Sequence, residues 1–186
     1  FKLVLPLTTA VTQVVTLRCG DLVFGVPATL VEVVRRGPGR EIDQAYNTGR
    51  FEHAGESVPF YWGGALLESS PRSTEPQGRS LPVVVLRSAS QRLAMHVDEV
   101  LGHQEVVVKN LGPQLSRLPG LAGMTVQASG AVLLIYNPVA LAAVYAEQAL
   151  AFSADRAQPD VLAGVTDVVP RLPSGPKVPL VLVVDD

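Results

Sequence analysis

The chain is poor in cysteine, in aromatic residues and in charge. Cys19 is the only cysteine among 186 residues, which excludes a disulfide framework and a zinc site built on cysteines. Aromatic residues make up 5% of the chain and charged residues 17%, and an intrinsically disordered chain would carry more charge and fewer apolar residues. The formal net charge is −2, whereas domains that bind nucleic acid are usually basic.

Long hydrophobic runs and the common catalytic motifs are also absent. The longest apolar runs, such as residues 81–86, fall far short of the ~18 residues that span a bilayer. The sequence has no glycine-rich phosphate loop and no Gly-x-Ser-x-Gly elbow, which excludes the usual nucleotide-binding and hydrolase motifs. His53, His96 and His103 do not fall at metal-ligand spacing with acids or with Cys19. We therefore predict no catalytic residues in this chain.

Valine is abundant, with 30 residues against 24 leucines. Branched side chains suit a pleated, half-buried surface, so this excess favours β structure. Sixteen glycines and 15 prolines indicate many turns. Short strands separated by turn signals predict a mainly β, small-barrel architecture. The expected strands are residues 13–18, 22–26, 31–36, 58–62, 81–87, 92–97, 104–109, 124–128 and 131–136.

One helix and two long loops complete the predicted organisation. The helix is expected over residues 138–150, because Pro138 suits the first helical position and Asn137 can cap it with its side-chain oxygen. Residues 36–57 and 68–80 are rich in glycine, charge and polar side chains. They are therefore predicted to be loops.

Two pairs of acidic residues invite a chemical interpretation. Asp98 and Glu99 are adjacent, so on a strand they would point to opposite faces and make a poor acid–base pair. Asp185 and Asp186 directly follow the apolar run 178–184. Two carboxylates in that position could hold a hard cation such as Mg²⁺, and the alternative is an acidic chain end without a ligand.

The stretch VDEVLGHQEVVVKNL, residues 97–111, resembles the signature of the CheW-like domain. That domain occurs as the free adaptor of bacterial chemotaxis and as the regulatory domain of CheA-type histidine kinases. Residues 14–27, 118–126 and 130–137 continue the resemblance, which covers residues 11–149. It implies a mainly β fold of two small five-stranded SH3-like barrels side by side, with a C-terminal helix.

The flanks resemble parts of neighbouring domains. Residues 1–10 resemble the last strand of a histidine-kinase ATP-binding domain, residues 150–177 are predicted to be a linker, and residues 178–186 resemble the first strand of a response-regulator receiver. This layout is similar to that of a hybrid CheA-type kinase in a two-component phosphorelay. The resemblance implies a non-catalytic segment without its own cofactor, in a parent enzyme that uses ATP and Mg²⁺. Asp185 and Asp186 would hold Mg²⁺ only in an intact receiver.

The resemblance also implies partners and a place in the cell. The expected partners are a CheW-type adaptor, the cytoplasmic tip of a chemoreceptor and other domains of the parent kinase, with no nucleic acid and no direct membrane insertion. The expected location is cytoplasmic, at membrane-associated receptor arrays. The residues expected to contact partners, by position, are Val31, Val33, Tyr61, Trp62, Leu101 and Gln104.

For each of these six residues the alternative is core packing or a neutral place on the surface, and for Val31, Val33 and Trp62 that alternative is core packing. The free adaptor usually carries an Asn-Leu-Arg-Gly element where this chain has residues 60–64, FYWGG, so the arginine linked to receptor contact is missing. Three other functions remain open at this point. They are a free-standing adaptor, a nucleic-acid-binding small barrel, which would need a basic groove with stacking aromatics, and a flavin-binding split barrel, which would be yellow.

Overall fold

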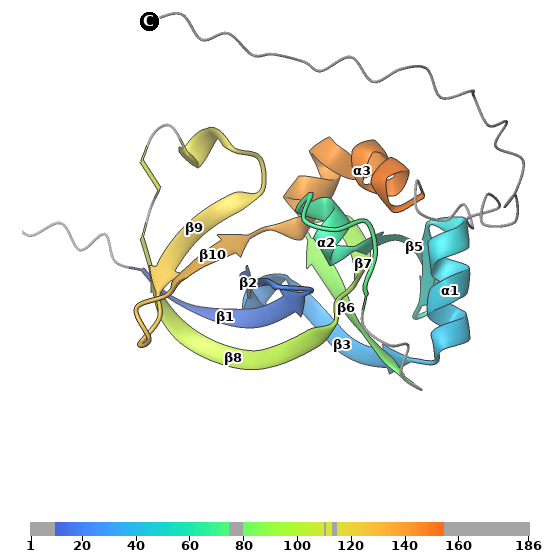
Figure 1. Ribbon diagram of the computed structural model, residues 1–186, viewed down its shortest axis with the longest axis horizontal. Coiled ribbons are helices and arrows are strands. Elements are labelled where there is room, and N and C mark those ends of the chain that lie inside the picture. The colour runs from blue at the N-terminus through green and yellow to red at the C-terminus, as the bar shows by residue number, and fades with distance from the viewer. Residues whose placement is uncertain (1–9, 75–79, 110, 113–114, 155–186) are drawn as a thin grey trace, which may run out of the picture.

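The computed structural model describes residues 10–74, 80–109, 111–112 and 115–154, and within them ten strands form two five-stranded sheets that lie side by side (Figure 1). The first sheet contains β1 (Ala10–Cys19), β2 (Leu22–Pro27), β8 (Glu99–Val108), β9 (Leu121–Val126) and β10 (Val132–Tyr136). The second contains β3 (Val31–Gly37), β4 (Arg50–His53), β5 (Glu56–Trp62), β6 (Leu81–Ser88) and β7 (Gln91–His96). The helices are α1 (Gly39–Thr48), α2 (Gly63–Leu66) and α3 (Pro138–Ala154), with 3-10 turns η1 (Ala28–Leu30) and η2 (Leu115–Arg117).

The two sheets share one pattern of strand directions. Their orders are β8-β1-β2-β10-β9 and β3-β6-β7-β5-β4. Across each sheet, the neighbouring pairs run antiparallel, antiparallel, parallel and antiparallel. This arrangement confirms the predicted mainly β fold of two five-stranded units, although no repeat is visible in the sequence.

The central parallel pair of each sheet includes a small residue. Gly25 lies opposite Ile135 in the first sheet, and Ala94 lies opposite Phe60 in the second. A Cβ added to Gly25 would lie 2.5 Å from Cγ1 of Val14, so the interior of the first sheet accepts only glycine at this position without rearrangement.

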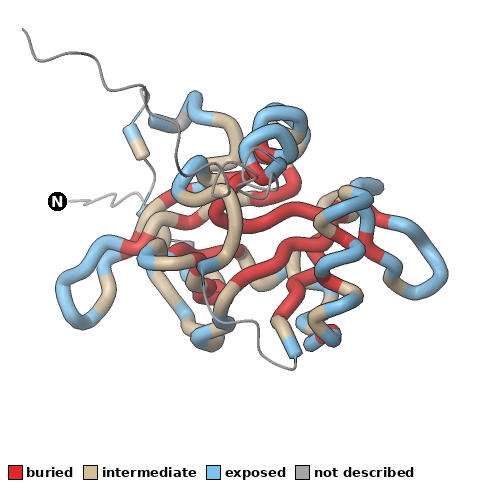
Figure 2. The backbone as a smooth tube through the Cα atoms, turned by 45° about the vertical axis from the view of Figure 1, so that its right-hand side comes forward, coloured by how far each residue is buried: buried red, intermediate tan, exposed pale blue. Residues whose placement is uncertain are grey.

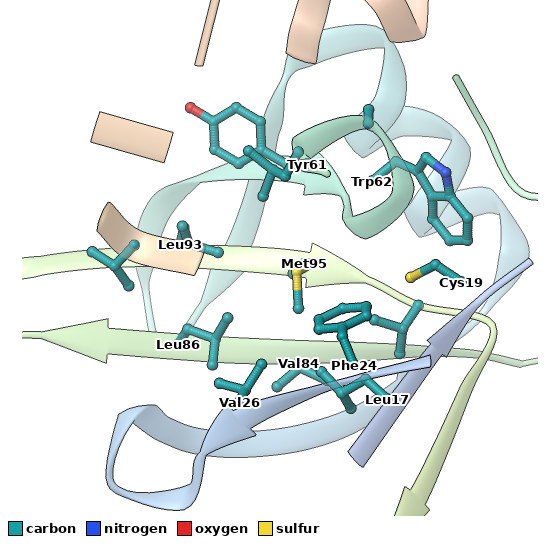
Figure 3. Packing of buried hydrophobic residues seen from close by; sticks show 14 of the residues in the cluster. Leu17, Cys19, Phe24, Val26, Tyr61, Trp62, Val84, Leu86, Leu93 and Met95 are labelled. Atoms are coloured by element: carbon teal, nitrogen blue, oxygen red, sulfur yellow. The ribbon is translucent and has the colours of Figure 1, made fainter. Parts of the chain in front are cut away.

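The main hydrophobic core lies between the two sheets. Side chains from β1 and β2 meet side chains from β6 and β7, and Figure 3 shows this contact from close by. The backbone of this central region is buried, while the ends of both sheets are exposed (Figure 2). Its members include Leu17, Phe24, Val26, Trp62, Val84, Leu86, Leu93 and Met95. The two barrels therefore share this main core and form one structural unit, while a second, smaller cluster fills the interior of the second sheet.

The prediction of a loop over residues 36–57 was wrong. The segment forms α1 and β4, and Ile42 and Phe51 fill the interior of the second sheet with exposed fractions of 0% and 2%. Pro38 precedes the helix, and Gly49 ends it in the left-handed region with φ of 66°, its N–H donating to the carbonyl of Ala45. Most side chains of α1 are polar and face outward, so the composition of this segment resembles that of a loop. Only a narrow apolar stripe is needed for the helix to cover the end of a small barrel.

The C-terminal helix confirms its predicted start and extends beyond its predicted end. The Oδ1 atom of Asn137 accepts the N–H groups of Val139 and Ala140 at 3.1 and 3.2 Å, as expected for an N-cap. The helix continues to Ala154, so residues 150–154 belong to the helix and not to the predicted linker. Among the described helices, none is both long and apolar enough to cross a bilayer. The predictions for residues 1–9 and 155–186, including Asp185 and Asp186, lie outside the described residues.

Candidate protein-interaction surface

The described residues offer surfaces rather than a chemical site. They contain no group of three or more His, Cys, Asp or Glu side chains placed to hold a metal ion. Five hollows lined by described residues measure about 180 to 390 Å³, near or below the low end of typical small-molecule sites, which run from about 300 to 1,000 Å³. Burial also raises the pKa of the Cys19 thiol, as expected of a packed side chain rather than a reactive one. The features of the described residues that could bind a partner are therefore their exposed apolar side chains.

Four exposed valines lie at one end of the first sheet, and we name them the valine patch. Val11, Val107, Val126 and Val132 are 66%, 42%, 49% and 59% exposed. Val11 is the register partner of Val107 across β1 and β8, and Val126 is the partner of Val132 across β9 and β10. The patch is thus made of two cross-strand pairs rather than of scattered residues.

Backbone hydrogen bonds between β8 and β9 bring the two pairs together. The N–H of Lys109 donates to the carbonyl of Met124 at 2.8 Å, and the N–H of Met124 donates back at 3.2 Å. Two residues further along the two strands stand Val107 and Val126. Figure 1 shows the start of β1, the end of β8, the end of β9 and the start of β10 gathered at the end of the first sheet that is farthest from the second.

These valines cannot turn inward, because the alternating residues already fill the sheet interior. Leu133 and Ile135 of β10 are 2% and 1% exposed, and Val14 of β1 is fully buried. Side chains of a strand alternate between the two faces, so the valines next to these buried positions face outward. A contiguous exposed apolar group of this kind is typical of a surface that binds another protein. Sequence reasoning missed it, since a single exposed valine is unremarkable on any strand.

The predicted contact residues on β3 are only partly accessible. Val31 and Val33 are half-buried, and Val31 packs against the main core. The pairing of β3 with β6 is irregular between these two residues, and Glu32 and Val34 are the exposed side chains of this stretch. Val34 is 39% exposed. The apolar residue that β3 offers most openly to a partner is therefore Val34, which sequence reasoning did not select.

The aromatic pair on β5 is inside the protein. Trp62 is 1% exposed and Tyr61 is 8% exposed. Figure 3 shows the Trp62 ring beside Cys19 and the Tyr61 hydroxyl pointing away from the core. The Nε1 atom of Trp62 donates to Oγ of Ser70 at 3.0 Å. Neither ring offers its face to a partner in this structure, so a partner contact by this pair stays a prediction.

Leu101 and Gln104 lie together on β8 beside an irregularity in the strand pairing. Thr16 pairs with Gly102 and Leu17 pairs with Val100, which leaves Leu101 as an extra residue with 48% exposure. Such a bulge changes the direction of the local side chain.

Gln104 donates through Nε2 to Oγ1 of Thr16 at 3.0 Å. Leu101 and Gln104 line a shared hollow of about 390 Å³. Of the predicted contacts, Leu101 is the most exposed.

Two titratable side chains, those of Tyr46 and His96, contact each other inside the protein. The hydroxyl of Tyr46 lies 2.7 Å from Nδ1 of His96, which is 2% exposed. Burial lowers the pKa of His96 to about 4, although the nearby Asp98 carboxylate acts in the opposite direction. Burial also raises the pKa of the Tyr46 hydroxyl. Both groups therefore stay neutral at physiological pH.

Comparisons with known proteins agree on one family. The model of the CheW-like domain matches residues 13–145. The protein named chemotaxis protein CheA from Salmonella typhimurium is 31% identical over 155 residues, which cover 82% of this chain and 23% of that protein. The sensor histidine kinase CheAY from Helicobacter pylori is 28% identical over 151 residues, covering 73% of this chain and 17% of that protein. The chain thus spans only about a fifth of the length of these relatives.

A solved structure supports the fold. The scaffolding protein TtCheW from Thermoanaerobacter tengcongensis matches with a TM-score of 0.51 at 11% identity. The match covers 69% of this chain and 90% of that one. At this level of identity the likeness concerns the arrangement of strands alone.

Proposed function

The chain belongs to the CheW-like domain family, and from this membership we propose that it is the regulatory domain of a CheA-type histidine kinase. In this role it joins the kinase to a CheW-type adaptor and to the cytoplasmic tip of a chemoreceptor. The chemotaxis names of its relatives support the proposal, since they include both a CheA and a CheAY. Histidine phosphorylation, with ATP and Mg²⁺, would belong to other domains of the parent protein, in the cytoplasm at receptor arrays.

The valine patch is the observation that carries this proposal. A domain without chemistry of its own acts by binding, and it changes kinase activity only if its partners bind the two states of the assembly with different affinity. The patch lies at the end of the first sheet that is farthest from the second sheet, away from the shared core. We assign this surface to the adaptor and the exposed side of β3 to the receptor.

The adaptor contact can be tested by introducing charge into the valine patch. Val107→Glu combined with Val126→Glu should weaken binding of the CheW-type adaptor of the same organism by at least about 100-fold, because each buried carboxylate would lose its hydration. Isothermal titration calorimetry measures the affinity, and the melting temperature checks the fold. Val34→Glu is the matched control. Adaptor affinity unchanged in the stable double variant would exclude this surface.

The receptor contact can be tested on β3. Val34→Glu should weaken binding of a purified chemoreceptor tip fragment by about tenfold while stability stays near that of the wild type, since Val34 is exposed. Val31→Glu should instead destabilise the fold, because Val31 packs against the main core. Pull-down with the receptor fragment and thermal melting separate the two effects. Full receptor binding by Val34→Glu would argue against a role of this strand.

The hybrid layout is a further part of the proposal. The CheAY relative supports a kinase joined to a receiver, and a gliding motility regulatory protein from Myxococcus xanthus, 31% identical over 144 residues, extends the family to surface motility. Residues 178–186 would then begin the receiver. The parent reading frame tests this directly, because a receiver must continue after residue 186 and an ATP-binding domain must precede residue 1.

A further inference from the structure

Residues 67–74, which we name the strap, follow α2 in the chain and contact the C-terminal end of α3. Side chains of the strap, those of Ser70, Arg72 and Ser73 among them, accept or donate hydrogen bonds to other parts of the chain, and the Oγ–H of Ser73 donates to the carboxylate of Asp98. Ser70 accepts the Nε1–H of Trp62 at 3.0 Å, and Nε of Arg72 donates to the carbonyl of Ser153 at 3.1 Å. The bond from Arg72 joins residues 81 positions apart in the sequence. The strap therefore fastens the last turn of α3 to the body of the domain.

Arg72 supplies what the end of α3 lacks. The last turn of this helix contains no basic residue, and the last four carbonyls of any α-helix have no partner within the helix. A cation placed there is favoured by the helix dipole and can donate to the free carbonyls. Arg72 provides both the donor and the positive charge from a distant part of the chain.

The same guanidinium also contacts α1. Its central carbon lies 4.6 Å from the centroid of the Tyr46 ring, in a cation–π contact. The Tyr46 hydroxyl reaches Nδ1 of the buried His96 on β7, and its ring packs edge-on against Phe60 on β5. Arg72 thus holds the end of α3 against α1 and, through Tyr46, against the second sheet.

We propose that Arg72 is a latch that fixes the last turn of α3 and thereby sets the direction of the helix at its C-terminal end. Thirty-two residues follow Ala154 in the sequence, and they lie outside the described residues. Arg72 is only half-buried and borders a hollow of about 180 Å³. Its contacts can therefore open without unpacking the core, as expected of a low-energy local motion.

The latch would couple two distant parts of the domain. α1 directly follows β3, the strand that exposes Val34. A displacement of β3 that shifts α1 would move Tyr46 under the Arg72 guanidinium and so alter the support of α3. The latch rests on contacts within this chain, and it stands whether or not the proposed partners bind.

Hydrogen exchange on the full 186-residue chain tests the latch. Arg72→Ala should accelerate exchange of the amides in the last turn of α3 and at the end of α1 by about tenfold, because one charge-assisted hydrogen bond is lost. Exchange in β6 and β7 should not change. Arg87→Ala is the matched control, since Arg87 makes a local bond to the carbonyl of Ala89. Wild-type exchange at the end of α3, or equal acceleration everywhere, would overturn the proposal.

Variants of Tyr46 separate the latch from general stability. Tyr46→Phe keeps the ring under Arg72 and should preserve protection at the end of α3, whereas Tyr46→Leu should lose it. Spin labels at Gln44→Cys and Ala154→Cys give a second readout, since Cys19 is buried and should not react. The distance distribution between the labels should be narrow in the wild type and broad with Arg72→Ala. Equal widths would contradict a latch, even if the Tyr46→Leu variant failed to fold.

Discussion

Replacing Trp62 with alanine should lower the free energy of unfolding by about 4 kcal/mol, in the range observed for the loss of large buried aromatic side chains. Trp62 heads the fully buried side chains by volume and is 1% exposed. Its ring lies in the core that the two sheets share, and its centroid is 5.0 Å from the centroid of the His96 ring. The loss would therefore leave a cavity against both sheets and also leave Oγ of Ser70 without its donor.

Urea unfolding followed by circular dichroism measures this effect, because the substitution removes the only tryptophan and with it the fluorescence probe. Trp62→Phe is the control, and it should cost roughly half as much since it retains most of the apolar volume. The experiment also decides between two roles for the residue. Unchanged stability together with lost partner binding would restore the surface role that the sequence indicated.

Acid should destabilise the protein through His96 in particular. In the unfolded chain this histidine titrates near 6.5, and in the folded protein burial lowers its pKa to about 4. Between these values the unfolded state binds the proton and the folded state does not, so the free energy of unfolding falls as the pH falls. The part of the free energy of unfolding that depends on neutral His96 is fully present above pH 6.5. About 3 kcal/mol of it should be lost between pH 7 and pH 4.

Urea unfolding of the wild type and of His96→Gln at several pH values between 7 and 4 isolates this contribution. Glutamine keeps an acceptor for the Tyr46 hydroxyl but cannot titrate, so the variant should be less stable at pH 7 and show a shallower decline toward pH 4. His103→Gln, at an exposed histidine on β8, should decline as the wild type does. Parallel curves for the wild type and His96→Gln would assign the acid sensitivity to other groups.

Local patterns predicted most of the elements for clear reasons. Alternating apolar residues with turn signals located the strands, and Asn137 with Pro138 located the start of α3. α1 was missed because Ile42 and Ala45 form too short an apolar stripe to outweigh the polar residues around them. The sequence also did not show that both sheets have the same order of parallel and antiparallel strand pairs. Two units can share a fold without sharing a repeated sequence.

The candidate contacts were harder to predict than the fold. Position along the family pattern selected Val31, Tyr61 and Trp62, but all three pack into the core. The exposed alternatives, Val34 and the valine patch, carry no local signal that distinguishes them from core valines. Which contacts the partners use stays a prediction for the binding experiments.

The sequence by itself determined the family, the mainly β class and the capping of α3, because motifs and periodicity are properties of neighbouring residues. Only the tertiary structure decided which face of each strand meets solvent. Val11 and Val15 point to the same face of β1, four residues apart, yet they are 66% and 0% exposed. The second sheet covers the half of β1 that carries Val15 and ends before Val11. Alternation defines two faces of a strand, but burial depends on which distant segment lies against each face.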